Sequence, residues 1–137
     1  MATTGSCLCG KLTYSYTGEP AKKAVCHCLE CQKLTGTAFT SNWLVPRENF
    51  TLNGTPKYNS FIQEIGVEVK YSFCGDCGTV IAKQSEADMF KPFYLVQAGT
   101  IATEPLVKEK PDVEFWVSRK ASWLDEVKGA AQAQKFS

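Results

Sequence analysis

Three cysteines and the only histidine of the chain lie close together near residue 27, and these residue types can hold a metal ion. Cys26, Cys28 and Cys31, called the cysteine trio below, fall within six residues and bracket His27. Three thiolates can surround one zinc ion and leave its fourth position open, whereas a structural site is closed by four protein ligands. The trio therefore predicts a zinc enzyme whose open site accepts a small ligand such as a thiol. The alternative is a closed structural knuckle whose fourth ligand comes from elsewhere in the chain.

Two further cysteine pairs have spacings that suit a metal. They are Cys7 with Cys9 and Cys74 with Cys77, and Gly75 inside the second pair allows a tight backbone turn. Tetrahedral zinc with bonds of about 2.3 Å needs its sulfur ligands roughly 4 Å apart, which both spacings allow. Seven cysteines in a chain with no recognisable export signal indicate metal ligands rather than disulfides.

The spacing leaves the grouping of these ligands open. The two pairs together would form a closed four-thiolate site and leave the trio as a second site. One pair could instead complete the trio, or His27 could join three cysteines in a mixed set. We expect His27 to orient the backbone or to hydrogen-bond near the metal, because a histidine flanked by two ligands more often does so than binds directly.

Composition and charge exclude several classes of protein. The 137 residues are 44% hydrophobic and 21% charged, as in an ordinary globular protein, and we expect one domain over residues 1–137. The net charge of +1 predicts no nucleic-acid partner. No apolar run is long enough to cross a bilayer, and the first ten residues lack the features of a secretion signal. We therefore expect no membrane partner and a cytoplasmic location.

The pattern of residues predicts a mainly β fold. Asn53 and Gly54 form a hairpin-type turn signal, and Ser122 with Asp125 resembles a capping box for a short C-terminal helix within residues 122–137. The three tryptophans are expected in the core. Strands are expected at residues 11–16, 37–45, 67–73, 79–82, 93–101 and 113–117, so that a strand enters and a strand leaves the second cysteine pair.

The ordered segments around the cysteines resemble a known family. The segments are SCLCGKLTY, CHCLECQKLTGTAF and YSFCGDCGTVI, followed by PDVEFWVSRKASWL near the end. They are similar to the glutathione-dependent formaldehyde-activating enzymes, a family that also includes the domain of centromere protein V. The resemblance covers about residues 5–124. It implies a zinc-binding β-tent domain, in which strands are pitched over a zinc knuckle.

The same resemblance implies the roles of all seven cysteines. It implies that two zinc ions bind per chain, one structural and one catalytic. The structural ligands would be Cys7, Cys9, Cys74 and Cys77, and the catalytic ligands would be Cys26, Cys28 and Cys31.

The implied activity is a carbon–sulfur lyase reaction like that of S-(hydroxymethyl)glutathione synthase. Glutathione or another thiol would be the co-substrate, and formaldehyde or a similar small electrophile would be its partner. The candidates for binding the carboxylates of glutathione are Lys22, Lys23, Gln32 and Lys33. The alternative is a non-catalytic, zinc-stabilised binding or structural module of the same family. With either function, a homodimer is one assembly that the chain could adopt. A chaperone-like partner of small GTPases shares the tent fold, but the additional trio argues against it.

Overall fold

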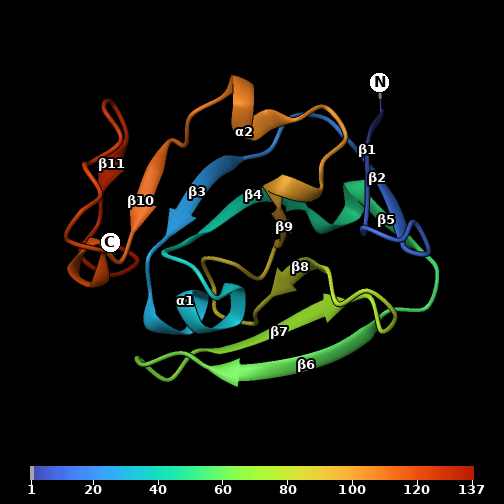
Figure 1. The fold of residues 1–137 in the computed structure, drawn as a ribbon, viewed down its shortest axis with the longest axis horizontal. Coiled ribbons are helices and arrows are strands. Elements are labelled where there is room, and N and C mark those ends of the chain that lie inside the picture. The colour runs from blue at the N-terminus through green and yellow to red at the C-terminus, as the bar shows by residue number, and fades with distance from the viewer. Residues whose placement is uncertain (1) are drawn as a thin grey trace.

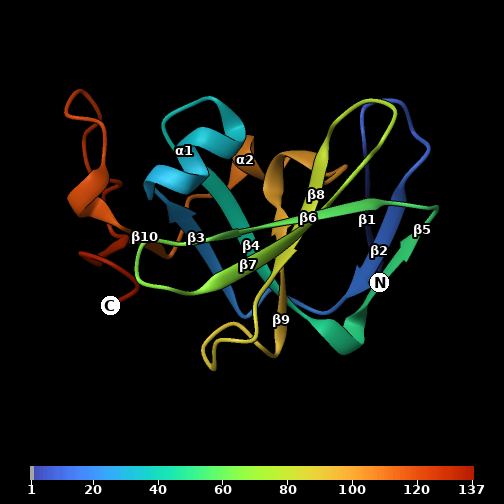
Figure 2. The same cartoon turned by 90° about the horizontal axis from the view of Figure 1, so that it is seen from below.

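The chain is built mainly from β-strands, as the sequence predicts. In the computed structural model, which describes residues 2–137, eleven strands form a three-stranded and an eight-stranded sheet (Figures 1 and 2). Two short helices accompany them, α1 (Leu29–Thr35) and α2 (Pro105–Lys108). Within the described range, neither helix has the length and hydropathy required to span a membrane.

The small sheet positions the first cysteine pair. It consists of β1 (Ala2–Ser6), β2 (Thr13–Thr17) and β5 (Phe50–Asn53), which are antiparallel in the order β1-β2-β5. The loop between β1 and β2 carries Cys7 and Cys9. The strand expected at residues 11–16 corresponds to β2.

The large sheet positions the remaining cysteines. Its order is β11-β10-β3-β4-β9-β8-β7-β6, with β10 parallel to both β3 and β11 and all other pairs antiparallel. The sheet curls so that the β6–β7 hairpin lies across from β3 and β4 (Figure 1). The strands are β3 (Lys22–Cys26), β4 (Thr40–Pro46), β6 (Lys57–Ile62), β7 (Glu68–Phe73), β8 (Val80–Gln84), β9 (Phe93–Gln97), β10 (Val113–Phe115) and β11 (Ala131–Gln132).

The buried side chains form two clusters, and each contains cysteines of one group. The first cluster packs the small sheet against β4, β8 and β9 and includes Cys7 and Cys74 together with Tyr14 and Trp43. The second cluster contains the whole cysteine trio, packed with residues of β10 and with Phe90. The trio and two cysteines of the other group therefore belong to the hydrophobic core, whereas Cys9 is exposed.

The prediction of a C-terminal helix is wrong. Within residues 122–137 the described chain has turns and the short strand β11, which pairs with β10 in parallel. The backbone N–H groups of Ala131 and Ala133 donate to the carbonyls of Asp112 and Glu114. Gly129 adopts a φ of +87°, which breaks a right-handed helix. Sheet pairing thus replaces the helix that the capping signal predicted.

Two smaller expectations also need correction. The turn at Asn53 and Gly54 does not join a hairpin, because β5 pairs with β2 while the following β6 pairs with β7. Trp43 and Trp116 are buried as expected, but Trp123 is 75% exposed. Trp123 lies in the segment for which a helix was expected, and the turns found there leave its side chain in solvent.

Candidate metal centres

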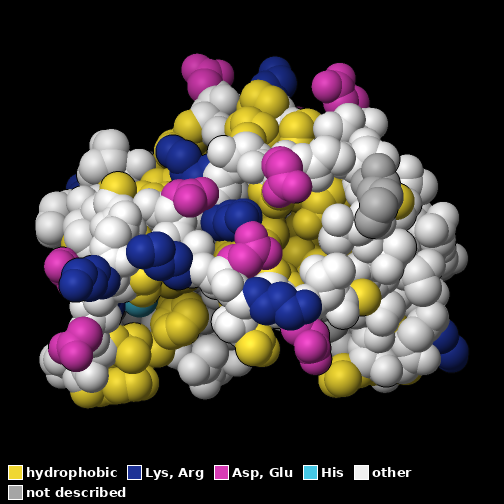
Figure 3. All heavy atoms as spheres, turned by 90° about the horizontal axis from the view of Figure 1, so that it is seen from above, with side chains coloured by type: hydrophobic (Ala, Val, Ile, Leu, Met, Phe, Trp, Pro, Cys, Tyr) yellow, Lys and Arg dark blue, Asp and Glu magenta, His cyan; other side chains and the backbone are white. Residues whose placement is uncertain are grey.

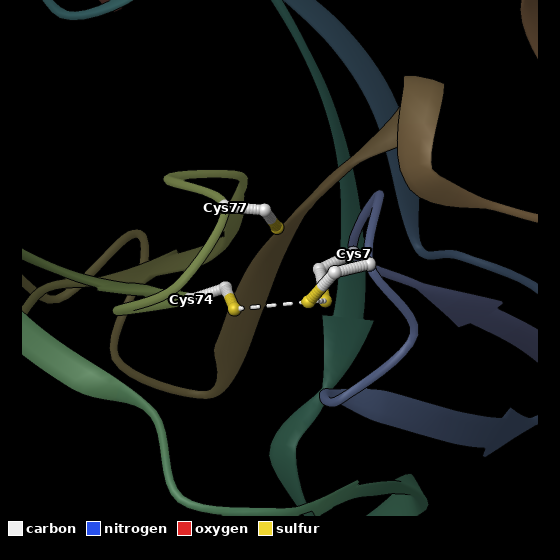
Figure 4. Close-up of side chains that lie close together, drawn as sticks. Cys7, Cys74 and Cys77 are labelled. Carbon is white, nitrogen blue, oxygen red and sulfur yellow. Dashed lines mark hydrogen bonds between the residues drawn. The ribbon is translucent and has the colours of Figure 1, made fainter.

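The two cysteine pairs come together at one place between the sheets. The sulfur atoms of Cys7, Cys9, Cys74 and Cys77, called the four-cysteine cluster below, all lie within 4.8 Å of one another. Cys9 Sγ is 3.6 Å from both Cys7 Sγ and Cys74 Sγ. Figure 4 shows Cys7 on the β1–β2 loop and Cys74 and Cys77 on the β7–β8 loop pointing toward one another.

Local hydrogen bonds favour ionised sulfur at two members of the four-cysteine cluster, Cys7 and Cys77. The backbone N–H of Leu12 donates to Cys7 Sγ at 3.3 Å, and Thr79 Oγ1 lies 3.2 Å from Cys77 Sγ. Hydrogen bonds from Thr79 lower the pKa of Cys77 to about 5. Such hydrogen bonds to sulfur are the outer contacts that orient metal ligands. The turn that holds Cys74 and Cys77 closes through a 2.8 Å bond from the N–H of Gly78 to the carbonyl of Cys74.

This geometry fits zinc. A tetrahedron with zinc–sulfur bonds of about 2.3 Å has edges of about 3.8 Å. The two 3.6 Å sulfur–sulfur distances are close to that edge. Four thiolates would fill all four positions, so the four-cysteine cluster suits a closed, structural ion.

The cysteine trio forms a second group, which lies in the second buried cluster. Cys26 ends β3, Cys28 caps the N-terminus of α1, and Cys31 lies in the helix, with their sulfur atoms within 4.8 Å of one another. Cys28 Sγ accepts the N–H of Cys31 at 3.3 Å, as a capping side chain does. All three side chains are buried. Gly36, at a φ of +70°, ends this single short helix.

A buried lysine contacts the trio. Lys83 on β8 is 3% exposed, and its Nζ lies 3.6 Å from Cys31 Sγ and 3.2 Å from Thr40 Oγ1. Hydrogen bonds from Cys26 and Cys28 lower the pKa of Cys31 well below its ordinary value, and the charge of Lys83 adds to this effect. The site therefore favours a thiolate at Cys31 even before a metal is considered.

His27 lies outside both sulfur groups. Its side chain is 1% exposed, its Nε2 lies 2.8 Å from Glu114 Oε1, and its ring meets Phe39 edge-on. The backbone N–H of His27 donates to the carbonyl of Phe115. His27 thus ties the loop between two trio cysteines to β10, which matches the expectation that it orients the backbone.

Glu114 also anchors the C-terminal segment beside the trio. Its carboxylate is buried and accepts from Lys120 Nζ at 2.9 Å, from the N–H of Val127 at 2.8 Å and from Gln132 Nε2 at 2.6 Å. Burial alone would raise the pKa of Glu114. The hydrogen bonds that it accepts, the strongest from Gln132, instead lower this pKa to about 2.

The trio opens onto a small, mainly apolar cavity. A space of about 40 Å³ is lined by the three cysteines and by aromatic and aliphatic side chains, with Gln63 and Lys83 among the polar residues. Phe136, from the segment that Glu114 anchors, forms part of the wall and packs edge-to-face on Phe90 and Phe115 at 5.1 and 5.5 Å. Such a space holds a few heavy atoms, since one water needs roughly 10–15 Å³ by the same measure.

The expected glutathione-binding side chains are only partly free. Lys23 forms an ion pair with Glu109, and Gln32 Nε2 donates to the backbone carbonyls of His27 and Arg119. Lys22 and Lys33 are exposed. On the face shown in Figure 3, acidic and basic side chains are interspersed. Sequence reasoning missed Gln63, Lys83, Glu114 and Phe136, because each lies far from the trio along the chain.

A mainly β fold with two convergent cysteine groups suits a metal-binding protein, and the comparisons give its family. The family model described as glutathione-dependent formaldehyde-activating enzyme matches residues 2–119, and the chain belongs to this family. Relatives named after the same family in Aspergillus flavus and Aspergillus oryzae are each 30% identical over 95 residues, which is 67% of this chain. The chain spans about half the length of these relatives, 49% in each case.

A solved structure supports the fold alone. The crystal structure of a Rhodobacter sphaeroides protein superimposes with a TM-score of 0.56 at 16% identity, covering 72% of this chain and 87% of that chain. Together with the family match, this similarity confirms the expected mainly β class. The family match confirms the resemblance that the cysteine segments indicated.

Proposed function

We propose that this chain is a zinc-dependent carbon–sulfur lyase-type enzyme, similar to S-(hydroxymethyl)glutathione synthase. Its substrates would be glutathione or another thiol and formaldehyde or a similar small electrophile. The observation that carries the proposal is that three buried cysteine sulfurs, rather than four, line a small cavity. Membership of the formaldehyde-activating family supports the choice of substrates. All seven cysteines are unpaired, which suits a reducing compartment, and we propose a cytoplasmic location.

The proposed ligand sets follow the two sulfur groups. Cys7, Cys9, Cys74 and Cys77 would hold a structural zinc, and Cys26, Cys28 and Cys31 would hold a catalytic zinc. When bound to the trio, zinc would supply an open position at which an incoming thiol loses its proton.

The chain itself contributes position, charge and exclusion of water. The end of β3 and the first turn of α1 fix the three sulfurs, while the aromatic wall that includes Phe136 keeps the cavity apolar. Lys83 places a cationic side chain against Cys31, which offsets the negative charge of the thiolates. Reacting groups held in such a cavity meet in a fixed geometry, which lowers the entropic part of the barrier.

The test is the rate at which formaldehyde exchanges with its glutathione adduct. Because the adduct also forms spontaneously, we would measure exchange by NMR magnetisation transfer with ¹³C-formaldehyde, with and without the zinc-loaded protein. The proposal predicts acceleration by the wild type and none by Cys28→Ser that is shown by circular dichroism to remain folded. An exchange rate equal to the protein-free rate would exclude glutathione–formaldehyde chemistry. Acceleration that Cys28→Ser retains would exclude the trio as its site.

A further inference from the structure

We infer that Gln63 and Lys83 form a hydrogen-bonding site for the oxygen of a small neutral carbonyl compound inside the trio cavity. This inference rests on the proposed function in that the carbonyl compound would be the electrophile. Both side chains line the cavity together with the three trio cysteines. They come from the β6–β7 loop and from β8, segments remote from the trio in the sequence.

Gln63 offers an N–H group that the described residues leave without a partner. Its side chain is 2% exposed, and its Oε1 accepts the N–H of Ile65 at 3.1 Å, which fixes the orientation of the amide. The backbone of the same residue is held by a 2.8 Å bond to Val67 and a 2.7 Å bond from Gly66. Within residues 2–137, Gln63 Nε2 has no hydrogen-bond acceptor. Because buried polar groups are nearly always satisfied, this amide calls for an acceptor in the cavity.

Lys83 provides the second donor. An ammonium group can donate three hydrogen bonds, and the described contacts of Lys83 Nζ use two of them, toward Cys31 Sγ and Thr40 Oγ1. The remaining donor is available to a ligand beside Cys31. Both donors line the cavity that holds the trio sulfurs, and two donors that reach one carbonyl oxygen would stabilise the charge that develops on it.

The surroundings favour a neutral and very small ligand. Apolar side chains such as Phe61, Val69 and Leu95 form much of the wall, so a charged ligand would lose its hydration without full replacement. The thiolates of the trio would also repel an anion. The space of about 40 Å³ admits only a few heavy atoms. These features together select a short aldehyde rather than a carboxylate as the ligand of Gln63 and Lys83.

The chemical step balances without a redox partner. A thiol sulfur adds to the carbonyl carbon, so that one carbon–sulfur bond forms and the carbon–oxygen π bond breaks. The π electrons move onto the oxygen that Gln63 and Lys83 would contact. The proton that the thiol loses passes to solvent, the oxygen takes up a proton from solvent as the adduct leaves the cavity, and the product is a hemithioacetal. Nothing is oxidised or reduced.

The binding test uses formamide and formate, which have nearly the same size but differ in charge. We would titrate each into ¹⁵N-labelled, zinc-loaded protein and follow the side-chain amide of Gln63 and the backbone amides around Lys83 by NMR. We expect formamide to shift these signals and to bind more tightly than formate. In Gln63→Met and in Lys83→Met, the formamide dissociation constant should rise at least tenfold. The exposed-residue controls Gln134→Met and Lys91→Met should leave it unchanged.

Several results would overturn the site. Tighter binding of formate would show an anion site, and formamide binding that is unchanged in Gln63→Met would remove the proposed donor. The zinc content of each variant is measured in parallel, because Lys83 touches Cys31. If Lys83→Met loses zinc, Gln63→Met decides the question, since Gln63 has no described bond to a cysteine.

Kinetics separate this inference from the proposed function. Removing one such donor lowers kcat about 100- to 1,000-fold in comparable oxyanion sites, and we expect kcat/KM for exchange to fall at least about 100-fold in Gln63→Met. If the wild type does not accelerate exchange but binds formamide through Gln63, the proposed function fails and the carbonyl site stands. If the wild type accelerates exchange and Gln63→Met changes neither binding nor rate, the carbonyl site fails and the function stands.

Discussion

Replacing Glu114 with glutamine should weaken the connection between the trio loop and the C-terminal segment. The Glu114 side chain is 1% exposed and joins His27, Lys120 and the segment around Val127. Glu114→Gln keeps the shape of the side chain but removes its charge. It also turns one oxygen into an NH₂ group, which then faces donors instead of accepting from them.

The pKa of Glu114 gives the size of the effect. This pKa falls from an ordinary 4.5 to about 2 in the folded chain. The difference corresponds to roughly 3.4 kcal/mol of stability at neutral pH, and solvent near Lys120 reduces the expected value to about 2–3 kcal/mol. Because the folded pKa is depressed, the contribution is complete well above pH 4.5 and is lost as the pH falls toward 2. Roughly a quarter of it should be lost by pH 4.

The assay is urea unfolding followed by tryptophan fluorescence at a fixed free zinc concentration. We would compare wild type, Glu114→Gln and the exposed control Glu126→Gln at pH values from 7 to 4. Taking the difference between two proteins at each pH removes the effect of zinc release, which both share. We expect Glu114→Gln to be about 2–3 kcal/mol less stable at pH 7 and the gap to narrow in acid. A gap below about 0.5 kcal/mol, the usual size for surface substitutions, or one that widens in acid would refute the reasoning.

Three further predictions follow from the contacts described. Phe136→Ala removes a half-buried ring from the cavity wall and should lower the free energy of unfolding, measured in urea, by about 1–2 kcal/mol. The same variant should raise kcat/KM for acetaldehyde relative to formaldehyde about tenfold. An unchanged ratio would contradict a role of Phe136 in size selection. Gly54→Ala should cost about 1–3 kcal/mol, because the residue has a φ of +103° and a new Cβ would lie 2.6 Å from the Lys11 carbonyl. Gly66→Ala is the control for backbone strain alone, because Gly66 has a φ of +89° and no atom lies within 4 Å of the new Cβ. It should lower the free energy of unfolding less than Gly54→Ala does. Equal losses in the two variants would exclude a contribution from the clash with the Lys11 carbonyl. Cys74→Ser should reduce the bound zinc measured by mass spectrometry and lower the thermal midpoint, and a variant with unchanged zinc content would contradict its place in the four-cysteine cluster.

Local patterns in the sequence predicted six of the eleven described strands and the second cysteine turn. The segment from Glu68 to Phe73 alternates polar and apolar residues as a strand does, and it leads directly to Cys74 and Cys77. The expected C-terminal helix was wrong because long-range bonds to Glu114 and Asp112 outweigh the local capping signal. A residue's own neighbours in sequence carry no information about such distant acceptors.

The lining of the cavity shows the same limit. Lys83 lies in β8, whose middle residues are buried, but a lysine in a strand is ordinarily expected at the surface. Its role follows only from its contact with Cys31, which is 52 residues away in the sequence. Gln63 is polar and lies in a loop, where solvent exposure is the usual expectation. Its burial results from the β6–β7 hairpin lying across from β3 and β4, an arrangement that only the folded chain reveals.

The most direct test of the central claim is the zinc content of the purified protein. We would measure zinc per chain by mass spectrometry in the wild type, in Cys28→Ser and in Cys26→Ala/Cys28→Ala/Cys31→Ala, with circular dichroism to establish folding. If the trio is a separate open site, the wild type holds two zinc ions and the folded triple variant holds one. One zinc ion in the wild type, or a triple variant that loses both ions and its β-sheet signal, would contradict a separate catalytic site and support a structural role for the trio.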